Sequence, residues 1–292
     1  MPIRRLSTSA RDKLCWVALL GGDTEMNAYT QVMSDRFEVV VPSAPEGMDS
    51  VEWEARLELA ACYRIVACYG WTSVVYNHIT LRIPGTSHFL INPFGMRYEE
   101  IRASDLIRID REGNPVSQSE WPVNQAGYVI HSVVHSCRDD LHCVLHTHEP
   151  ISQSICALDH EVIPLTQEGC QFFERVGYHN YEGIVLNGSE GPLIAKALGE
   201  RNHTLVLKNH GLLTAGENCA WALTRHQAFI RNADVQLRAM AAGQINYIRE
   251  DVMIKTREQF EGGAAQAGAK VRHPEWPALV RLIDRSDPSW KH

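Results

Sequence analysis

The sequence lacks three features that would place it in a specialised class of protein. It contains eight cysteines but no pair at C-x-x-C spacing, so nothing supports a zinc knuckle or a dithiol redox motif. It has no apolar run of the roughly 20 residues that cross a bilayer. It has no excess of positive charge, because the net charge is −7, which argues against a broad nucleic-acid or acidic-membrane surface. We therefore expect neither nucleic acid nor membrane as a partner.

The remaining composition is that of an ordinary globular protein. Hydrophobic residues make up 45% and charged residues 22% of the 292 positions, enough for a sizeable core without disulfide bonds. The dispersed cysteines predict reduced thiols and a cytoplasmic protein. Near the start, basic residues precede the short apolar stretch LCWVALL, but no small-residue cleavage pattern follows it, so a secretory signal is not favoured.

The chain divides into three predicted segments. Residues 1–50 read as an extension that ends in the turn-rich stretch PSAPEGMDS, residues 51–245 as the main domain, and residues 246–292 as a tail that packs on the body or on a neighbouring subunit. The domain begins with a helix capped by Ser50 and ended by Gly70. Apolar periodicity predicts these further elements: strands at 78–83, 88–94, 105–110, 142–148 and 204–210, and helices at 126–137 and 219–242. Strands between helices favour a sheet covered on both faces.

One predicted strand carries a pair of candidate metal ligands. In HCVLHTH (142–148), alternation places Val144, His146 and His148 on one face of the strand. Two histidines at i and i+2 lie about 6–7 Å apart along the backbone, which allows both imidazoles to reach one ion at about 2.0–2.1 Å. A lone histidine is more often a hydrogen-bonded surface residue, but two on one face of an apolar strand are harder to explain in that way.

Six segments together resemble the class II aldolase/adducin family. They occur in order as VYNHITLRI, FLINPFGM, ASDLIRID, VNQAGYVIHSVVHSCRDDLHCVLHTHEP, RVGYHNYEGI and LVLKNHGLLTAGENCAWAL. The resemblance spans roughly residues 52–245. It implies a three-layer α/β/α fold with a central, largely antiparallel sheet, one divalent metal ion (Zn, Fe or Mn) held by His146, His148 and His210, a small-molecule substrate and a homotetramer.

The resemblance breaks at the position of an acid/base residue. In the sugar-phosphate aldolases of the family, a Ser-Ser-Glu run ends nineteen residues before the first metal histidine. Here that position is Gly127, preceded by Gln125 and Ala126. Glycine cannot move a proton, and Ala126 offers a phosphate only its backbone amide. A sugar phosphate is therefore a disfavoured substrate, and the pattern is closer to the adducin-like branch of the family.

Other residues are candidates for the missing acid/base role. His131 and His135 can share a helix face, although helix histidines more often pack and hydrogen-bond. Glu149 follows a ligand but should point away from the metal face. The remaining candidates are Glu168 in a loop-like stretch and Tyr178, His179 and Tyr181 in GYHNYEG.

Three further positions match substrate-binding positions of the family. They are Asn77, Asn92 and Gly95. The alternative for the asparagines is a structural role in capping a turn or strand end.

Three functions are consistent with these patterns. The first is a metal-dependent lyase, a decarboxylase or an aldolase, acting on a small non-phosphorylated hydroxy- or oxo-carboxylic acid; decarboxylation fits the missing glutamate best. The second uses Fe(II) at the same site for oxygen chemistry on an aromatic oxo-acid, as some members of the family do. The third is a non-catalytic, adducin-like interaction domain. Three histidines with open coordination positions favour an enzyme, because a scaffold gains little from an open-coordinate ion.

Overall fold

A seven-stranded sheet forms the centre of the computed structural model, which describes residues 3–5, 39–183, 188–267 and 273–292. The strand order is β5-β4-β3-β6-β9-β8-β7, and only the β7–β8 pair is parallel. The strand bounds are β3 (His78–Arg82), β4 (Phe89–Ile91), β5 (Ile107–Ile109), β6 (Cys143–Thr147), β7 (Val176–His179), β8 (Thr204–Leu207) and β9 (Gly211–Gly216). The predicted largely antiparallel sheet is confirmed. Residues 6–38 of the predicted extension lie outside the described ranges.

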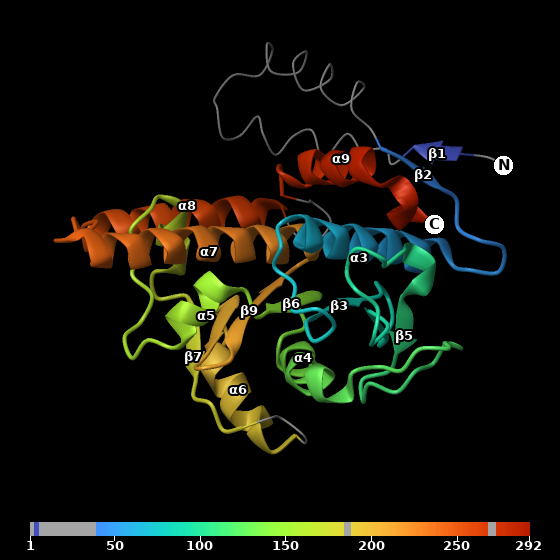
Figure 1. Cartoon of the computed structure of the whole chain (residues 1–292), viewed down its shortest axis with the longest axis horizontal. Helices are drawn as coiled ribbons and strands as arrows, with labels where there is room; N and C mark the ends of the chain where they lie inside the picture. The colour runs from blue at the N-terminus through green and yellow to red at the C-terminus, as the bar shows by residue number, and fades with distance from the viewer. Residues whose placement is uncertain (1–2, 6–38, 184–187, 268–272) are drawn as a thin grey trace, which may run out of the picture.

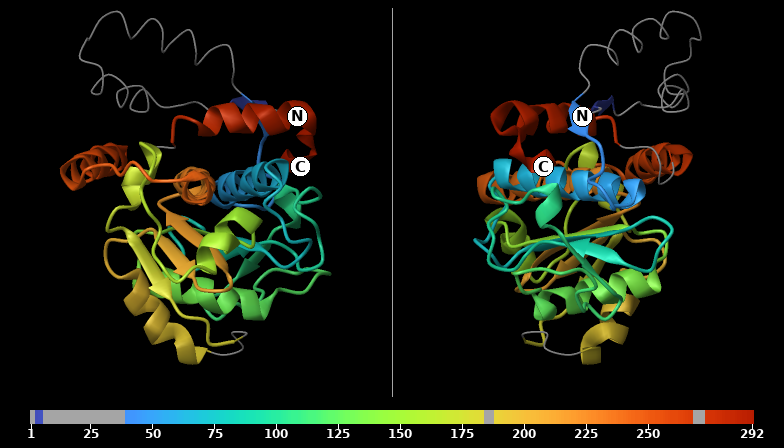
Figure 2. Two further views of the ribbon diagram at one scale, coloured as in Figure 1. Left: turned by 60° about the vertical axis from the view of Figure 1, so that its left-hand side comes forward. Right: turned by 90° about the vertical axis from the view of Figure 1, so that its right-hand side faces the viewer.

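Helices cover both faces of this sheet (Figures 1 and 2). On one face lie α3 (Ser50–Cys68), α5 (Pro150–Cys156) and α7 (Cys219–Ala242), and on the other lie α4 (Gln125–Cys137) and α6 (Gly191–Leu198). The predicted α/β/α architecture is therefore confirmed.

Strand β6 shows how the sequence divides the core between these two layers. Cys143 and Leu145 are fully buried in the larger cluster with α3 and α7. Val144, between them, is fully buried in the cluster that includes α4 and α6. The alternation predicted from the sequence therefore holds, and His146, in phase with Val144, belongs to the face covered by α4.

The first helix of the domain begins one residue earlier than predicted. Asp49, not Ser50, is its N-cap, since the Asp49 carboxylate accepts hydrogen bonds from the amides of Val51 and Glu52. An aspartate is at least as good a cap as a serine and also complements the helix dipole. The helix ends at Cys68, just before Gly70, whose φ of 72° suits glycine.

The segment after α7 packs back onto the domain. It forms α8 (Glu250–Ala267), α9 (Trp276–Ser286) and the short helix η4 (Pro288–Lys291). Arg64 of α3 donates hydrogen bonds to the Ile101 carbonyl (2.8 Å), the Asp287 carboxylate (2.7 Å) and the Ser289 hydroxyl (2.9 Å). One arginine thus ties the end of the chain to the first helix of the domain. Among the described helices, none has the length and apolarity to cross a membrane.

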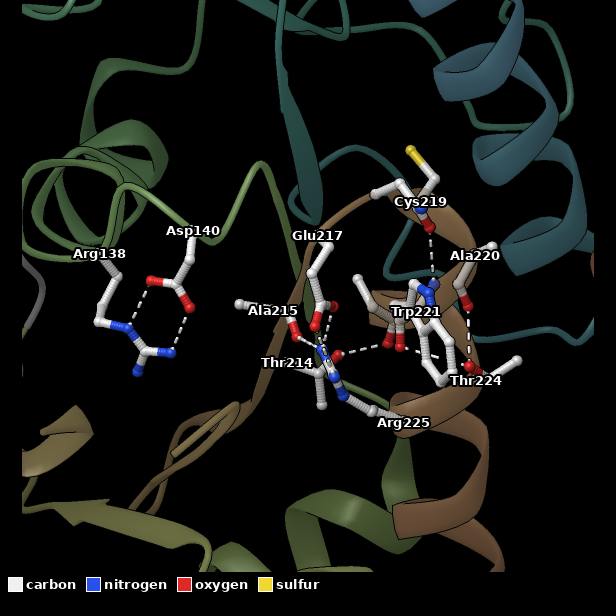
Figure 3. Close-up of polar contacts among 12 residues, drawn as sticks. Arg138, Asp140, Thr214, Ala215, Glu217, Cys219, Ala220, Trp221, Thr224 and Arg225 are labelled. Carbon is white, nitrogen blue, oxygen red and sulfur yellow. Dashed lines mark hydrogen bonds and ion pairs between the residues drawn. The ribbon is translucent and has the colours of Figure 1, made fainter. Parts of the chain in front are cut away.

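The junction between β9 and α7 is held by side chains (Figure 3). Arg225 donates to the Ala215 carbonyl and forms an ion pair with Glu217, both at 2.9 Å. Thr214 donates to the Ala222 carbonyl at 3.0 Å. These bonds fix β9 against the long helix, and with it the turn between β8 and β9 that carries His210.

Candidate metal centre

Three imidazoles converge at one end of the sheet. His146 lies on β6, His148 directly follows that strand, and His210 lies in the turn between β8 and β9. Their potential ligand atoms all lie within 4.8 Å of one another, and their ring centroids are 4.8–4.9 Å apart. The structure therefore brings together the three residues that the sequence predicts as metal ligands.

The backbone around His210 allows the close approach. Asn209 adopts a left-handed conformation with φ of 57°, which asparagine tolerates better than most residues. A Cβ on Gly211 would lie 2.6 Å from the Thr147 carbonyl oxygen, 2.9 Å from His148 Cδ2 and 3.0 Å from His146 Cε1. Only glycine fits there, which gives the N-H-G sequence a steric reason.

The donor set fits a divalent ion. The Nδ1 of His146 lies 2.9 Å from the Leu212 carbonyl oxygen, which can only accept, so Nδ1 carries the proton and Nε2 keeps its lone pair. That Nε2 lies 2.9 Å from the Nε2 of His148. Two nitrogens bound to one ion at about 2.0–2.1 Å would be about 2.9–3.4 Å apart at bond angles between 90° and tetrahedral. Among the described residues, the cluster contains no fourth protein ligand, so an ion held there would keep open coordination positions.

Burial favours the neutral form that a metal requires. It lowers the pKa of His146 well below its ordinary value, with further lowering from the neighbouring histidines. It also lowers the pKa of His148, and burial together with His148 and His179 lowers the pKa of His210 to about 4. A neutral imidazole offers a lone pair without first losing a proton.

Two further histidines lie at the same end and on the same face of the sheet. His78, at the start of β3, is the direct antiparallel partner of His146, so the two side chains share a face; their ring centroids are 5.4 Å apart. His179, at the end of β7, pairs in register with Leu207, which belongs to the core beneath α4 and α6. His78 and His179 therefore flank the three candidate metal ligands on opposite sides.

His179 is held by a carboxylate and borders the site. Its Nε2 lies 3.2 Å from Glu190 Oε2, and it lines a shallow pocket with Glu190, Lys208 and His210. Of the predicted acid/base candidates, His179 and the exposed Tyr181 line a pocket shared with a metal ligand. Glu190 was not predicted, because only the tertiary fold brings it to β7.

His131 lies one layer behind the site. His135 Nδ1 is 3.3 Å from the Leu141 carbonyl and so must donate to it, which leaves its Nε2 to accept from Thr80 Oγ1 at 2.8 Å. Thr80 therefore accepts from His131 Nδ1, also at 2.8 Å. The predicted shared face of His131 and His135 is correct. The ring of His131 packs against that of His78, with centroids 4.2 Å apart.

The remaining acid/base candidates lie elsewhere. Glu168 begins the short helix η2 (Glu168–Phe172), which packs against α7 and α8, and it is outside the three-histidine cluster. The Tyr178 hydroxyl accepts a hydrogen bond from the Val162 amide at 2.9 Å and lines a separate cavity. Glu149, which strand alternation directs away from the metal face, caps α5 with both carboxylate oxygens.

The predicted substrate-binding residues mostly make hydrogen bonds or packing contacts within the protein. Asn92 accepts from the Tyr63 hydroxyl at 2.9 Å and donates to the Pro93 carbonyl. Asn77 donates to the Trp71 carbonyl at 3.0 Å, but its buried Oδ1 has no partner in the described structure. Gly95, with φ of 112°, lies against the Trp121 ring.

Sequence and structure comparisons agree with this architecture. Residues 57–237 match the family described as the Class II Aldolase and Adducin N-terminal domain. An aldolase II superfamily protein of known structure from Pseudomonas syringae is 36% identical, with a TM-score of 0.77 over 85% of this chain and 98% of that one. An L-fuculose 1-phosphate aldolase from Glaciozyma antarctica is 28% identical, with a TM-score of 0.71 over 85% of this chain and 97% of that one. Alpha-adducin of Rattus norvegicus is 33% identical over 82% of this chain, which spans 35% of that adducin.

The chain therefore belongs to the class II aldolase and adducin family. This is a family of metal-dependent lyases that also contains adducins. The predicted family is confirmed, and the histidine cluster could bind the divalent metal that its aldolases use.

Proposed function

We propose that the protein is a divalent-metal-dependent carbon–carbon lyase. Its substrate would be a small hydroxy- or oxo-carboxylic acid without a phosphate group, and the reaction a decarboxylation or an aldol cleavage. The observation that carries this proposal is the convergence of three neutral imidazoles on one point with no fourth protein ligand among the described residues. When bound there, Zn, Fe or Mn would supply Lewis-acid stabilisation of the negative charge that develops as the bond breaks.

The surroundings of residue 127 support a substrate without phosphate. A Cβ on Gly127 would lie 2.8 Å from His78 Cε1, and His78 lies beside His146. Position 127 is therefore next to the metal site, as the resemblance to aldolases implies. Because it carries no side chain, neither a carboxylate nor an added phosphate-binding group reaches the site from there.

We assign the proton donor of the reaction to His179. It borders His210 in the shallow pocket, and its ring is held by Glu190. A carboxylate partner fixes the orientation of an imidazole. His131 is a weaker candidate, because its Nδ1 is bonded to Thr80 and its ring is fully buried behind His78.

A second candidate function is an adducin-like interaction domain. The 33% identity to rat alpha-adducin favours it. The two functions differ in what removal of the metal would change: an enzyme loses turnover, whereas a scaffold retains its partner binding.

The direct test is turnover of a panel of small hydroxy- and oxo-acids by protein stripped of metal and then reloaded with Zn, Mn or Fe(II). We expect metal-dependent release of carbon dioxide or an aldehyde from at least one acid, and loss of that activity in H179Q without loss of metal. Oxygen consumption coupled to turnover with Fe(II) would show an oxygenase instead. No turnover with any metal would contradict the enzyme and favour the interaction domain. We also expect a homotetramer, which light scattering on the same sample would test.

A further inference from the structure

The place beside the metal site that residue 127 leaves open is filled by the ring of His78. A Cβ on Gly127 would lie 2.8 Å from His78 Cε1 and 2.9 Å from both His78 Nδ1 and Asn124 Nδ2. All three contacts are shorter than those that a Cβ normally makes. The two positions therefore depend on each other, because a side chain at residue 127 would force the His78 ring and the Asn124 amide to move.

The His78 ring has unused hydrogen-bonding capacity. The residue is 4% exposed, and although the backbones of Tyr76 and Gly127 lie close to the ring, neither ring nitrogen makes a hydrogen bond of normal geometry. The ring is packed between His131, with centroids 4.2 Å apart, and His146, with centroids 5.4 Å apart. Buried polar atoms are normally paired, and an unpaired one calls for an explanation such as an absent ligand or water.

The chemistry of this ring differs from that of a carboxylate in the same place. A glutamate reaching the site from residue 127 would bring a negative charge next to the substrate and would repel a second anion. An imidazole has no anionic form at physiological pH and always keeps at least one N–H donor. The site thus offers a donor where an acid/base carboxylate would offer an acceptor.

We propose that His78 determines substrate specificity by donating a hydrogen bond to the carboxylate of an acid bound at the three-histidine site. His78 has the position for this, since it shares a sheet face with His146 and flanks the ligands on the side opposite His179. This inference rests on the proposed function and narrows it, because it assigns recognition of the carboxylate to one residue of the chain.

The test uses glycolate and its uncharged amide, glycolamide, as probes of the full-length protein loaded with Co(II). Dissociation constants come from the visible absorption of the bound cobalt. We expect the wild type to bind glycolate more tightly than glycolamide. We expect H78F, which keeps an aromatic ring but no donor, to bind glycolate about 10- to 100-fold more weakly, the usual effect of losing a hydrogen bond to a charged group. Glycolamide affinity and cobalt content should not change.

Two further variants separate this role from a packing role. H78Q keeps a side-chain N–H donor and should retain most of the preference for glycolate, whereas H160F, the same substitution as H78F at an exposed position, should behave as wild type. The double variant H78A/G127E places a carboxylate in the same space and should reverse the preference toward glycolamide. If H78F lost the ability to fold, this reversal would still test the proposal.

The outcomes separate the inference from the proposed function. Full glycolate affinity in H78F, or an unchanged preference in H78A/G127E, would overturn the role of His78 and leave the metal site intact. A wild-type protein that binds no cobalt would contradict the proposed function and this inference together.

Discussion

Gly211 offers a sharp test of how closely the backbone and the metal ligands are packed. Its backbone conformation is not in the left-handed region, so alanine would face no dihedral strain there. The added methyl would instead meet the Thr147 carbonyl oxygen at 2.6 Å and the rings of His148 and His146 at 2.9 and 3.0 Å. Contact alone therefore sets the effect of G211A.

The magnitude follows from what can move. The Thr147 carbonyl belongs to β6, and Thr147 pairs directly with Leu212 of β9, so the backbone cannot retreat without loss of sheet pairing. The two rings are the softer neighbours, and their displacement spoils the ligand geometry. Overpacking of this kind costs about 1–3 kcal/mol. If that energy falls on the metal-bound state, Zn affinity drops by about 5- to 150-fold.

The assay is competition for Zn against a chromophoric chelator, with G262A as a matched control. Gly262 has no atom within 4 Å of its would-be Cβ and lies on helix α8, so alanine there should leave Zn affinity unchanged and add up to about 1 kcal/mol of stability. Wild-type Zn affinity in G211A, with an unchanged melting temperature, would refute the packing argument.

Three other predictions follow from the described contacts. H179Q should lower kcat by about 100-fold or more if His179 transfers the proton, with metal content unchanged; an unaltered kcat would remove it from the reaction. His226 is buried between Thr147 and Thr214, and burial lowers its pKa to about 3. As the pH falls below about 6.5, the unfolded chain therefore takes up a proton at this histidine and the folded protein does not. The free energy of unfolding then falls by about 1.4 kcal/mol per pH unit between pH 6.5 and 3. The free energy of unfolding of metal-free protein, measured with urea at several pH values, should depend less steeply on pH in H226Q, by the equivalent of one proton. An identical pH dependence in H226Q would contradict this assignment. R64A removes the hydrogen bonds from Arg64 to Ile101, Asp287 and Ser289, and should speed proteolysis after residue 272. Unchanged cleavage would show that other contacts hold the tail.

Patterns among residues close in the sequence predicted several of the helices and strands. The alternation of HCVLHTH determined which face of β6 carries His146 and His148, and the apolar repeats predicted α3, α4 and α7. Strand β9 was not predicted, because GLLTAG is buried on both faces and has no alternation. Helix α8 was missed because glycine and alanine dominate its end.

The environment of the site was less accessible to sequence reasoning. His78 stands in a segment that matched the family, yet its position beside His146 depends on the register between β3 and β6. The pairing of His179 with Glu190 likewise depends on where the chain returns after β7. Loss of a carboxylate at Gly127 was visible in the sequence, but the ring that fills its place was visible only in three dimensions.

The presence of the metal site is tested most directly by the metal content of protein purified without added metal, measured in the wild type, H146A, H210A and the exposed-site control H160A. We expect about one divalent ion per chain in the wild type and in H160A, and none in H146A or H210A, because either change leaves only two of the three imidazoles. Stoichiometric metal that persists in both ligand variants, or a wild type that binds none even after reconstitution with Zn, Mn or Fe(II), would contradict it.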